Sequence, residues 1–151
     1  MKVIANNKKA YFDYFISDQI EAGIVLEGSE VKSVRAGGVS INESHVKIIN
    51  GEVFLINSYI KPFDKASSYV PEDRRSRKLL LSKKEINKYE RAIMEKGLTI
   101  VPLRVYLKGN LVKVEIALGK GKKLYDKRET LKEKSVQREI DSAIKNARKD
   151  R

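Results

Sequence analysis

Cysteine and tryptophan are absent from this chain of 151 residues, and histidine occurs only once. Without cysteine there can be no disulfide bond, no thiolate nucleophile and no zinc site with sulfur ligands. The single histidine, His45, also excludes a zinc site built from two or three imidazoles, and its place in a strand-like segment favours packing over catalysis. Composition therefore excludes enzymes with a cysteine nucleophile and enzymes whose zinc is held by cysteines or by several histidines. We expect neither a metal nor an organic cofactor.

Long apolar runs are missing as well. About 20 apolar residues are needed to cross a bilayer, whereas the uninterrupted apolar runs here span only a few residues, as at 23–26 and 79–81. Residues 1–9 lack the apolar stretch that a secretory signal requires. We therefore expect no membrane span and a cytoplasmic location.

Acidic residues are outnumbered, since 20 Asp and Glu stand against 32 Lys and Arg, for a net charge of +12. Residues 119–151 hold 12 of the basic and 6 of the acidic residues, which is half of the excess. Such charge attracts polyanions, and RNA, DNA and anionic lipid are all candidates at this point. The alternative is that the charge of residues 119–151 only keeps the tail solvated and binds no polyanion. With 41% apolar residues, the chain can still bury a core.

The spacing of apolar residues predicts a mainly β fold with accessory helices. Aromatic and β-branched residues at period-two spacing predict one long strand, or a bent pair, within 11–26. Asn50-Gly51 between two apolar runs predicts a tight hairpin over 45–56. A second hairpin is predicted over 99–118.

Two helices accompany these strands. Gly28-Ser29 offers a turn and an N-cap before a short helix over 30–35. A capping box that begins at Ser82 predicts a helix over 83–96.

The intervening and irregular segments are predicted from proline and charge. Residues 61–78 contain two of the three prolines and a basic cluster at 74–78, and we expect an exposed loop. Pro102 lacks an N–H, so its strand is expected to lie at an edge or to bulge there.

Antiparallel hairpins with interspersed helices favour an OB-type antiparallel β-barrel over a parallel sheet, whose regular strand–helix alternation is missing. A β-sandwich with flanking helices is the alternative. We expect residues 1–118 to form this body and residues 119–151 to form a basic C-terminal tail.

The predicted tail has two parts. A glycine-loosened, exposed arm is expected over 119–128, and a capping box that begins at Thr130 predicts a helix with a narrow apolar stripe. An isolated helix of this length is marginal in water. We expect the tail to be disordered when free and helical on a partner.

No catalytic motif stands out. Asp126 lacks the convergent carboxylates of a two-metal site, and the glycine-lysine segment 119–123 is too short for a phosphate-binding loop. Cations instead alternate with rings, as at Lys8 and Tyr11. Unpaired RNA is bound by charge along its backbone and by rings against its bases, although packing is the alternative role for any one ring. We expect a binding protein and no enzyme.

Six separated blocks carry a resemblance to a known family. They are residues 21–26, 28–37, 50–55, 77–81, 114–118 and 121–128. In this order, and from about Asn7 to the end, the chain resembles the bacterial SsrA-binding protein family, also called small protein B.

The resemblance implies an OB-fold body and a function in trans-translation. Members of this family bind the tRNA-like domain of transfer-messenger RNA and deliver it, with elongation factor Tu, to ribosomes stalled on truncated messages. The body substitutes for the missing anticodon arm, and the tail enters the empty mRNA channel of the small subunit near the decoding centre.

The resemblance also implies two sets of site residues. The RNA-binding set comprises Asn7, Lys8, Tyr14, Glu21, Leu80 and Lys113. The ribosome-binding set of the tail comprises Gly121, Lys122, Lys123, Tyr125, Asp126, Lys127, Arg128 and Ile144. Tyr11-Phe12 replaces an Arg-His pair that is common in the family, so that stacking by Phe12 is expected to replace a basic contact. Tyr125 stands where some members have histidine.

Two rival classes of function remain. A ribosomal or initiation-factor-like OB-fold protein that binds structured rRNA would explain the charge and the barrel, but not the apolar stripe of the tail. A basic amphipathic tail could instead lie on an anionic membrane. The stripe lacks Trp and Phe, which makes such insertion weak.

Overall fold

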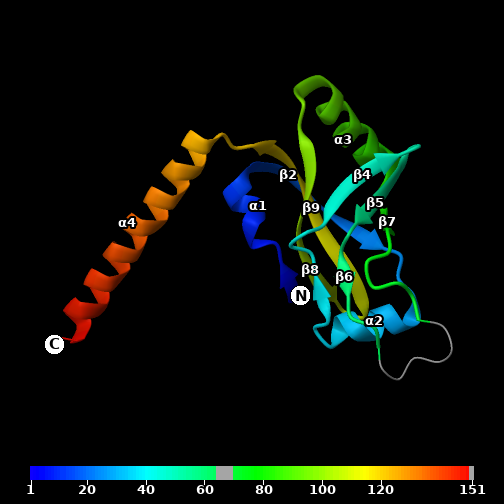
Figure 1. Cartoon of the computed structure of the whole chain (residues 1–151), viewed down its shortest axis with the longest axis horizontal. Helices are drawn as coiled ribbons and strands as arrows, with labels where there is room; N and C mark the ends of the chain where they lie inside the picture. Colours follow the sequence, from blue (N-terminus) through cyan, green and yellow to red (C-terminus); the bar gives the residue numbers. More distant parts are fainter. Residues whose placement is uncertain (64–69, 150–151) are drawn as a thin grey trace.

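The computed structural model describes the backbone of residues 1–63 and 70–149, and the side chains of these residues as far as residue 139. The elements in chain order are β1 (Lys2–Asn6), α1 (Lys8–Asp13), β2 (Tyr14–Ile24), α2 (Gly28–Arg35), β3 (Val39–Ser40), β4 (His45–Ile49), β5 (Glu52–Ile56), β6 (Tyr59–Ile60), β7 (Arg77–Leu80), α3 (Lys83–Lys96), β8 (Thr99–Lys108), β9 (Leu111–Gly121) and α4 (Leu124–Lys149). Figure 1 shows the strands curled together, with α2 and α3 at opposite ends and α4 projecting away.

One antiparallel sheet of seven strands forms the body, in the order β1-β8-β4-β5-β7-β2-β9, and β8 also pairs with β9. The sheet therefore curls back on itself, which favours the predicted OB-type barrel over a sandwich of two sheets. The barrel is not closed by continuous ladders, because a single residue pair, Val46 with Ile100, joins β4 to β8. The mainly β fold with accessory helices is confirmed.

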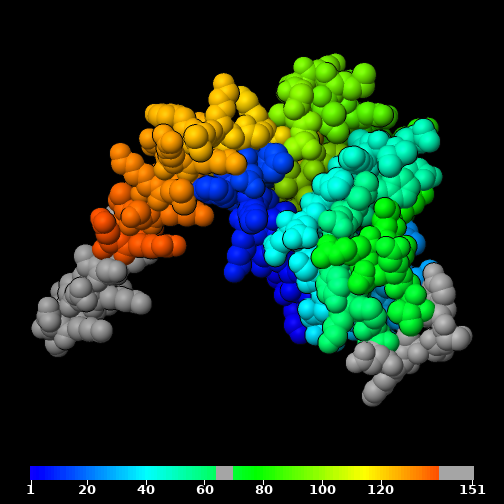
Figure 2. Space-filling model, viewed as in Figure 1, coloured from blue at the N-terminus to red at the C-terminus, as the bar shows by residue number. Residues whose placement is uncertain are grey.

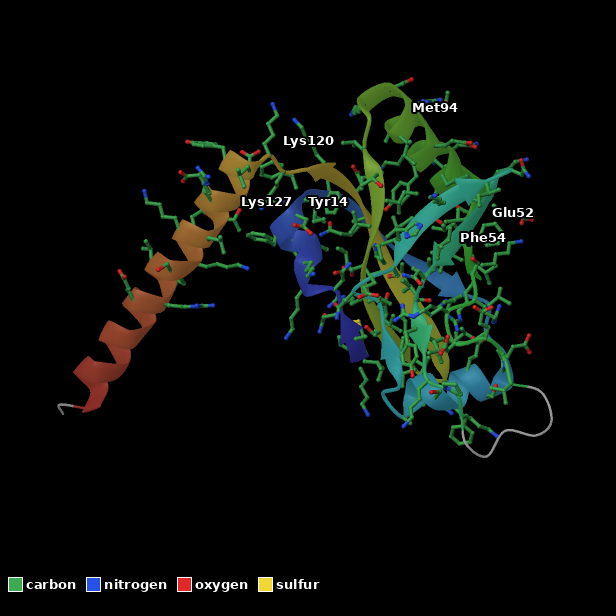
Figure 3. The ribbon with its side chains drawn as sticks, in the orientation of Figure 1. Tyr14, Glu52, Phe54, Met94, Lys120 and Lys127 are labelled. Atoms are coloured by element: carbon green, nitrogen blue, oxygen red, sulfur yellow. The ribbon has the colours of Figure 1, made fainter. Side chains whose placement is uncertain are left out.

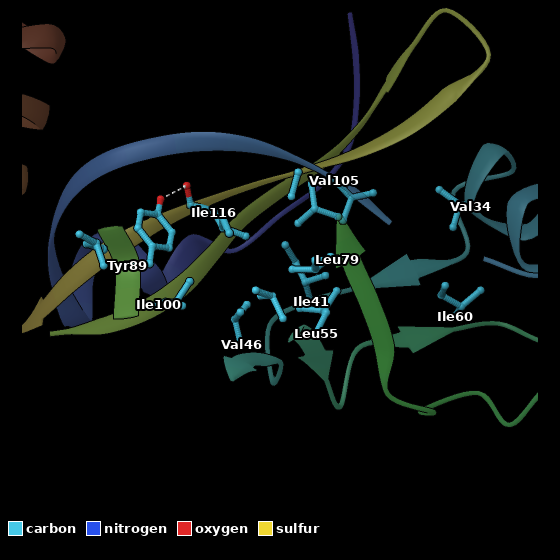
Figure 4. Close-up of a cluster of buried hydrophobic side chains, with 14 residues drawn as sticks. Val34, Ile41, Val46, Leu55, Ile60, Leu79, Tyr89, Ile100, Val105 and Ile116 are labelled. Carbon is cyan, nitrogen blue, oxygen red and sulfur yellow. Dashed lines mark hydrogen bonds between the residues drawn. The ribbon is translucent and has the colours of Figure 1, made fainter. Parts of the chain in front are cut away.

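The core fills the inside of this curled sheet (Figure 4). It takes one side chain in two from the long strands, as alternation requires, and includes Ala22, Leu79, Val105, Val114 and Ile116. At one end α3 inserts its buried Tyr89, whose hydroxyl donates to the backbone carbonyl oxygens of Asp18 and Ile116. Residues between these core positions must therefore point outward.

The first predicted hairpin and the predicted helix α3 are confirmed. Asn50 and Gly51 have φ angles of 51° and 76°, as a turn with two left-handed residues requires. The Ser82 hydroxyl accepts from the Glu85 amide at 3.2 Å, and the Glu85 carboxylate accepts from the Ser82 amide at 2.9 Å. Gly97 ends the helix at φ 65°.

The second predicted hairpin is confirmed, and it is longer than expected. Its first strand, β8, has partners on both sides, so Pro102 does not lie in an edge strand. The register shifts between Pro102 and Arg104, which confirms the expected bulge.

The strand predicted from Tyr11 is wrong at its start. Residues 8–13 form α1, and the strand begins at Tyr14. The helix covers the outer face of β8 and β9, where Ala10 packs with Val101, Leu103 and Ala117. This tertiary packing overrides the strand preference of the aromatic residues.

Helix α2 begins earlier than predicted and has a different cap. Its N-cap is Glu27, which forms a reciprocal capping box with Glu30, so that Gly28 and Ser29 lie inside the helix. The Glu27 amide donates to the Glu30 carboxylate at 2.9 Å. Glutamate is an uncommon N-cap residue, and Ser29 was the stronger local signal.

The predicted exposed loop over 61–78 is wrong at its end, in the basic cluster: Arg74 is exposed as expected, but Arg77 is buried and begins β7. The Arg77 side chain is 0% exposed, and Arg75 and Arg77 both donate to the buried Glu30 carboxylate. Burial alone would raise the pKa of Glu30, but these bonds and the Glu27 amide lower it below its usual value. The cluster therefore ties the 61–78 segment to α2.

The tail is organised differently from its prediction. Strand β9 continues to Gly121, so that 119–121 belong to the sheet, and α4 begins at Leu124. Thr130, the expected N-cap, lies inside α4, where its hydroxyl donates to the Asp126 carbonyl at 3.0 Å. The helical tail agrees with the prediction, and its disorder in the free protein stays a prediction. None of the described helices is long and apolar enough to span a membrane.

Candidate nucleic-acid interface

Three of the six predicted RNA-binding residues, Glu21, Leu80 and Lys113, lie on one outer face of the barrel. Gly23 of β2 pairs with Leu80 of β7 on one side and with Lys113 of β9 on the other. Their neighbours in the chain, Ala22, Leu79 and Val114, point into the core. Because paired residues share a face, Leu80 and Lys113 point outward with Glu21, two residues before Gly23. We call the outer surface formed by β7, β2, β9 and their neighbour β8 the four-strand face.

Strand β8 completes the four-strand face with residues that the sequence analysis missed. Tyr106 pairs with Lys113, and Arg104 pairs with Glu115. Arg104, Tyr106 and Lys108 alternate with the core residue Val105 along the strand. Period-two alternation within the predicted strand was the signal that could have placed them outside.

Glu21 is held in place on this face by residues of β8. The Tyr106 hydroxyl donates to Glu21 Oε1 at 2.5 Å, and Lys108 Nζ lies 3.5 Å from Oε2. The hydrogen bond from Tyr106 is the main cause that holds the pKa of Glu21 below its usual value. Burial and the bond to Glu21 raise the pKa of Tyr106. At neutral pH the pair is therefore a carboxylate with a neutral phenol.

A second charged pair lies beside it. Arg104 Nη2 donates to Glu115 Oε2 at 2.8 Å, and the Arg104 guanidinium lies 5.7 Å from the centre of the Tyr106 ring. Leu80 is 53% exposed, so an apolar side chain is accessible on this face. The face thus offers cations, two fixed carboxylates, of which Glu21 is the more exposed, and an apolar contact.

The other three predicted RNA-binding residues lie at the two ends of α1: Asn7 is its N-cap, Lys8 is its first residue, and Tyr14 begins β2 directly after it. Asn7 is 6% exposed, and its backbone N–H donates to the Leu103 carbonyl at 2.8 Å while Nδ2 donates to the Pro102 carbonyl at 2.9 Å. It therefore fastens the start of α1 to the bulge of β8. Lys8 is exposed, and Tyr14 packs partly buried against the cluster under α1.

The base of the tail contacts α1 at a second site, which we call the tail junction, made of residues 11–15 and 122–130. Lys127 Nζ lies 3.2 Å from Asp13 Oδ1 and 5.8 Å from the centre of the Phe12 ring. Lys122 Nζ donates to the Tyr11 carbonyl at 3.1 Å and lies 5.0 Å from the centre of the Phe15 ring. Figure 3 shows Lys127 and Tyr14 at this junction.

The predicted tail residues thus divide into two groups. Lys122 and Lys127 have partners inside the chain, and the Asp126 carboxylate accepts from the Lys123 amide at 3.1 Å, at the start of α4. Gly121, Lys123, Tyr125 and Arg128 are exposed. Ile144 lies beyond the residues whose side chains are described. The tail stands away from the body and touches the N-terminal segment at its base (Figure 2).

We expect replacement of Asp13 by alanine to loosen the first turns of α4, because Lys127 loses its ion-pair partner. A pair this exposed contributes about 0.2–1 kcal/mol, so amide exchange over 124–130 should speed up by at most about fivefold. Hydrogen exchange read by mass spectrometry measures this change.

Asp18→Ala is the control, because Asp18 forms a more exposed ion pair with Lys88 at 3.0 Å, away from the tail. It should leave exchange over 124–130 unchanged. Equal exchange in Asp13→Ala and the unmodified protein would contradict the contact.

Among the described residues, no cluster of three or more His, Cys, Asp or Glu side chains could hold a metal ion. The curled antiparallel sheet, the mixed polar face and the basic helix after it define a basic OB-type barrel protein with a helical tail. The family model of the SmpB protein matches residues 4–146, and the chain belongs to this family.

Named relatives match over nearly the whole chain. The SsrA-binding protein of Fusobacterium nucleatum is 54% identical over 144 residues, which are 95% of this chain and 97% of the relative. That of Bacillus subtilis is 50% identical over 148 residues, which are 98% and 95%. A solved structure described as "tmRNA-SmpB: a journey to the center of the bacterial ribosome" is 42% identical, with a TM-score of 0.66 over 83% of this chain and 92% of that one.

Proposed function

We propose that this protein binds the tRNA-like domain of transfer-messenger RNA and brings it to stalled ribosomes for trans-translation, in which the ribosome is rescued and the unfinished peptide is tagged. The observation that carries the proposal is the family match through residues 4–146, which includes both the four-strand face and the tail junction. Relatives named for SsrA binding and a solved relative named for transfer-messenger RNA and the ribosome support it.

In this proposal the four-strand face and α1 bind the RNA. Lys8 and Lys113 neutralise phosphates, and the exposed Leu80 contacts a base or a sugar. Tyr14 and Asn7 act mainly by fixing α1 against β8, since both are largely covered by protein. Glu21 contributes a hydrogen-bond acceptor among these cations.

The tail acts on the small ribosomal subunit, at the decoding centre and in the mRNA channel. Gly121 is the hinge, and Lys122, Lys123, Tyr125, Asp126, Lys127, Arg128 and Ile144 form the ribosome-facing side. The proposed division at 118 and 119 separates RNA binding from this later step. Elongation factor Tu is the proposed delivery partner, the cytoplasm the proposed location, and the protein acts by binding alone.

The test is the salt dependence of RNA binding by the full-length protein. Removal of one cation that neutralises a phosphate should reduce the log–log salt slope by about 0.7–0.9. Lys113→Ala should therefore weaken binding of the tRNA-like domain in gel shifts and flatten the slope by that amount.

Lys83→Ala is the control, because Lys83 is an exposed lysine at the start of α3 and lies outside the four-strand face. It should change neither the affinity nor the slope. The proposal would be wrong if RNA recovered with the native protein contained rRNA alone, which would favour an rRNA-binding protein.

A further inference from the structure

The protein itself occupies only part of the hydrogen-bond acceptor capacity of the Glu21 carboxylate. Its Oε1 accepts one hydrogen bond from Tyr106, and its Oε2 faces Lys108 at 3.5 Å. A carboxylate offers about four lone-pair positions on its two oxygens. Because 35% of the Glu21 side chain is exposed and the protein supplies few donors to it, the carboxylate keeps acceptor capacity for an incoming molecule.

Tyr106 fixes the direction of this acceptor pair. Its side chain is buried, with the whole residue 4% exposed, so the hydroxyl cannot follow a mobile carboxylate. The Arg104 guanidinium lies over the Tyr106 ring, and its Nη2 donates to Glu115 Oε2 at 2.8 Å. The series Glu115, Arg104, Tyr106, Glu21 joins β9, β8 and β2 through an ion pair, a cation–ring contact and a hydrogen bond, which together restrict where the Tyr106 hydroxyl can lie.

The chemistry of the face limits what this acceptor pair can bind. A phosphate would be repelled by the carboxylate, and a ribose hydroxyl donates only one hydrogen bond. Among unpaired bases, guanine presents two adjacent donors, the N1–H and the N2 amino group, on its Watson–Crick edge. The corresponding edges of adenine, cytosine and uracil place an acceptor beside the donor, and that acceptor would meet a carboxylate oxygen.

We infer that Glu21 binds the Watson–Crick edge of an unpaired guanine in the bound RNA, and that Tyr106 is the positioning residue that holds the carboxylate for this contact. The inference rests on the proposed function and adds a specificity to it. Lys108 and Lys113 flank the carboxylate and supply the charge that the RNA backbone requires. The lowered pKa of Glu21 keeps it an acceptor at neutral pH.

The first experiment is a double-mutant cycle in the full-length protein, with affinity for the tRNA-like domain read by gel shift. Tyr106→Phe keeps the ring and removes only the hydroxyl. It should weaken binding by about five- to tenfold in the unmodified background. In the Glu21→Ala background it should cause no further loss, because there is no carboxylate left to orient.

Tyr89→Phe is the matched control. The Tyr89→Phe variant also loses a buried hydroxyl that donates hydrogen bonds, in this case to backbone carbonyls. Tyr89 belongs to α3 and points into the core, so it is not part of the four-strand face. It should lower the melting temperature and leave RNA affinity unchanged. If Tyr106→Phe weakens binding equally with and without Glu21, or leaves it unchanged, the positioning role is overturned.

The second experiment identifies the base. Inosine lacks the N2 amino group of guanine, so it offers one donor where guanine offers two. Inosine placed at individual unpaired guanine positions of the tRNA-like domain should weaken binding by about tenfold at one position. The same substitution should not weaken binding to Glu21→Ala.

The outcomes separate the inference from the proposed function. If the unmodified protein does not bind the tRNA-like domain, the proposed function fails. If it binds and no inosine position distinguishes it from Glu21→Ala, guanine recognition is overturned while the proposed function stands.

Discussion

Arg77→Ala is expected to lower the free energy of unfolding by about 3–5 kcal/mol, because it removes the fully buried cation of a charge network and leaves buried acceptors without their donor, while Glu30 keeps Arg75 as its remaining cation. Arg77 Nε donates to Glu30 Oε2 at 2.7 Å, and Nη1 donates to the Ser58 carbonyl at 2.8 Å and to its hydroxyl at 2.9 Å. Nη2 donates to the Asp73 carbonyl at 3.0 Å. No smaller side chain can satisfy these four acceptors together.

Urea unfolding followed by circular dichroism measures this loss. The matched control is Arg74→Ala, since Arg74 is 42% exposed and pairs with the exposed Glu43 at 3.6 Å, a contact worth at most about 1 kcal/mol. Equal effects of Arg77→Ala and Arg74→Ala would contradict the network.

Tyr125→Ala combined with Arg128→Ala is expected to leave affinity for the isolated transfer-messenger RNA unchanged while reducing peptide tagging on stalled ribosomes by at least about tenfold. Tyr125 is 72% exposed and Arg128 is exposed, so neither stabilises the body. Loss of one stacked base costs about 1–3 kcal/mol, and removal of a cation from a phosphate adds to this cost. Tenfold corresponds to about 1.4 kcal/mol.

The measurement is paired, with gel-shift affinity for the RNA and tagging of a product from a message without a stop codon. Leu131→Ala combined with Lys132→Ala is the control, since it removes one exposed apolar and one exposed basic residue further along α4. This control variant should reduce tagging less than the Tyr125→Ala, Arg128→Ala variant does. Normal tagging by the Tyr125 and Arg128 variant would contradict the tail's role, and an equal loss of RNA affinity would move that role to the first binding step.

Features decided by neighbouring residues were predictable from the sequence. Asn50-Gly51 specifies its turn because both residues tolerate positive φ, and Ser82 with Glu85 specifies the start of α3 through bonds three residues apart. The hairpin over 99–118 and the bulge at Pro102 were predictable for the same reason. These signals do not depend on the rest of the fold.

Features decided by distant partners were not predictable in this way. The short helix over residues 8–13 exists because Ala10 packs on strands about 90 residues later, and Arg77 is buried because Glu30 lies opposite it. Of the candidate site, the resemblance supplied Glu21, Leu80 and Lys113. It did not supply Tyr106, which is 85 residues from Glu21 in the chain and touches it only in the folded barrel.

Helix α4 has 26 residues, so at 1.5 Å per residue it is a rod of about 39 Å. As far as its side chains are described, to residue 139, the helix is held to the body at its first turns, by the short segment after Gly121 and by the contacts of Lys122 and Lys127. A rotation of about 15° at that end sweeps the far end through roughly 10 Å, the width of an α-helix. The direction of this rod is set at its base by one ion pair, two hydrogen bonds from Lys122 and two cation–ring contacts, of which the ion pair contributes at most about 1 kcal/mol.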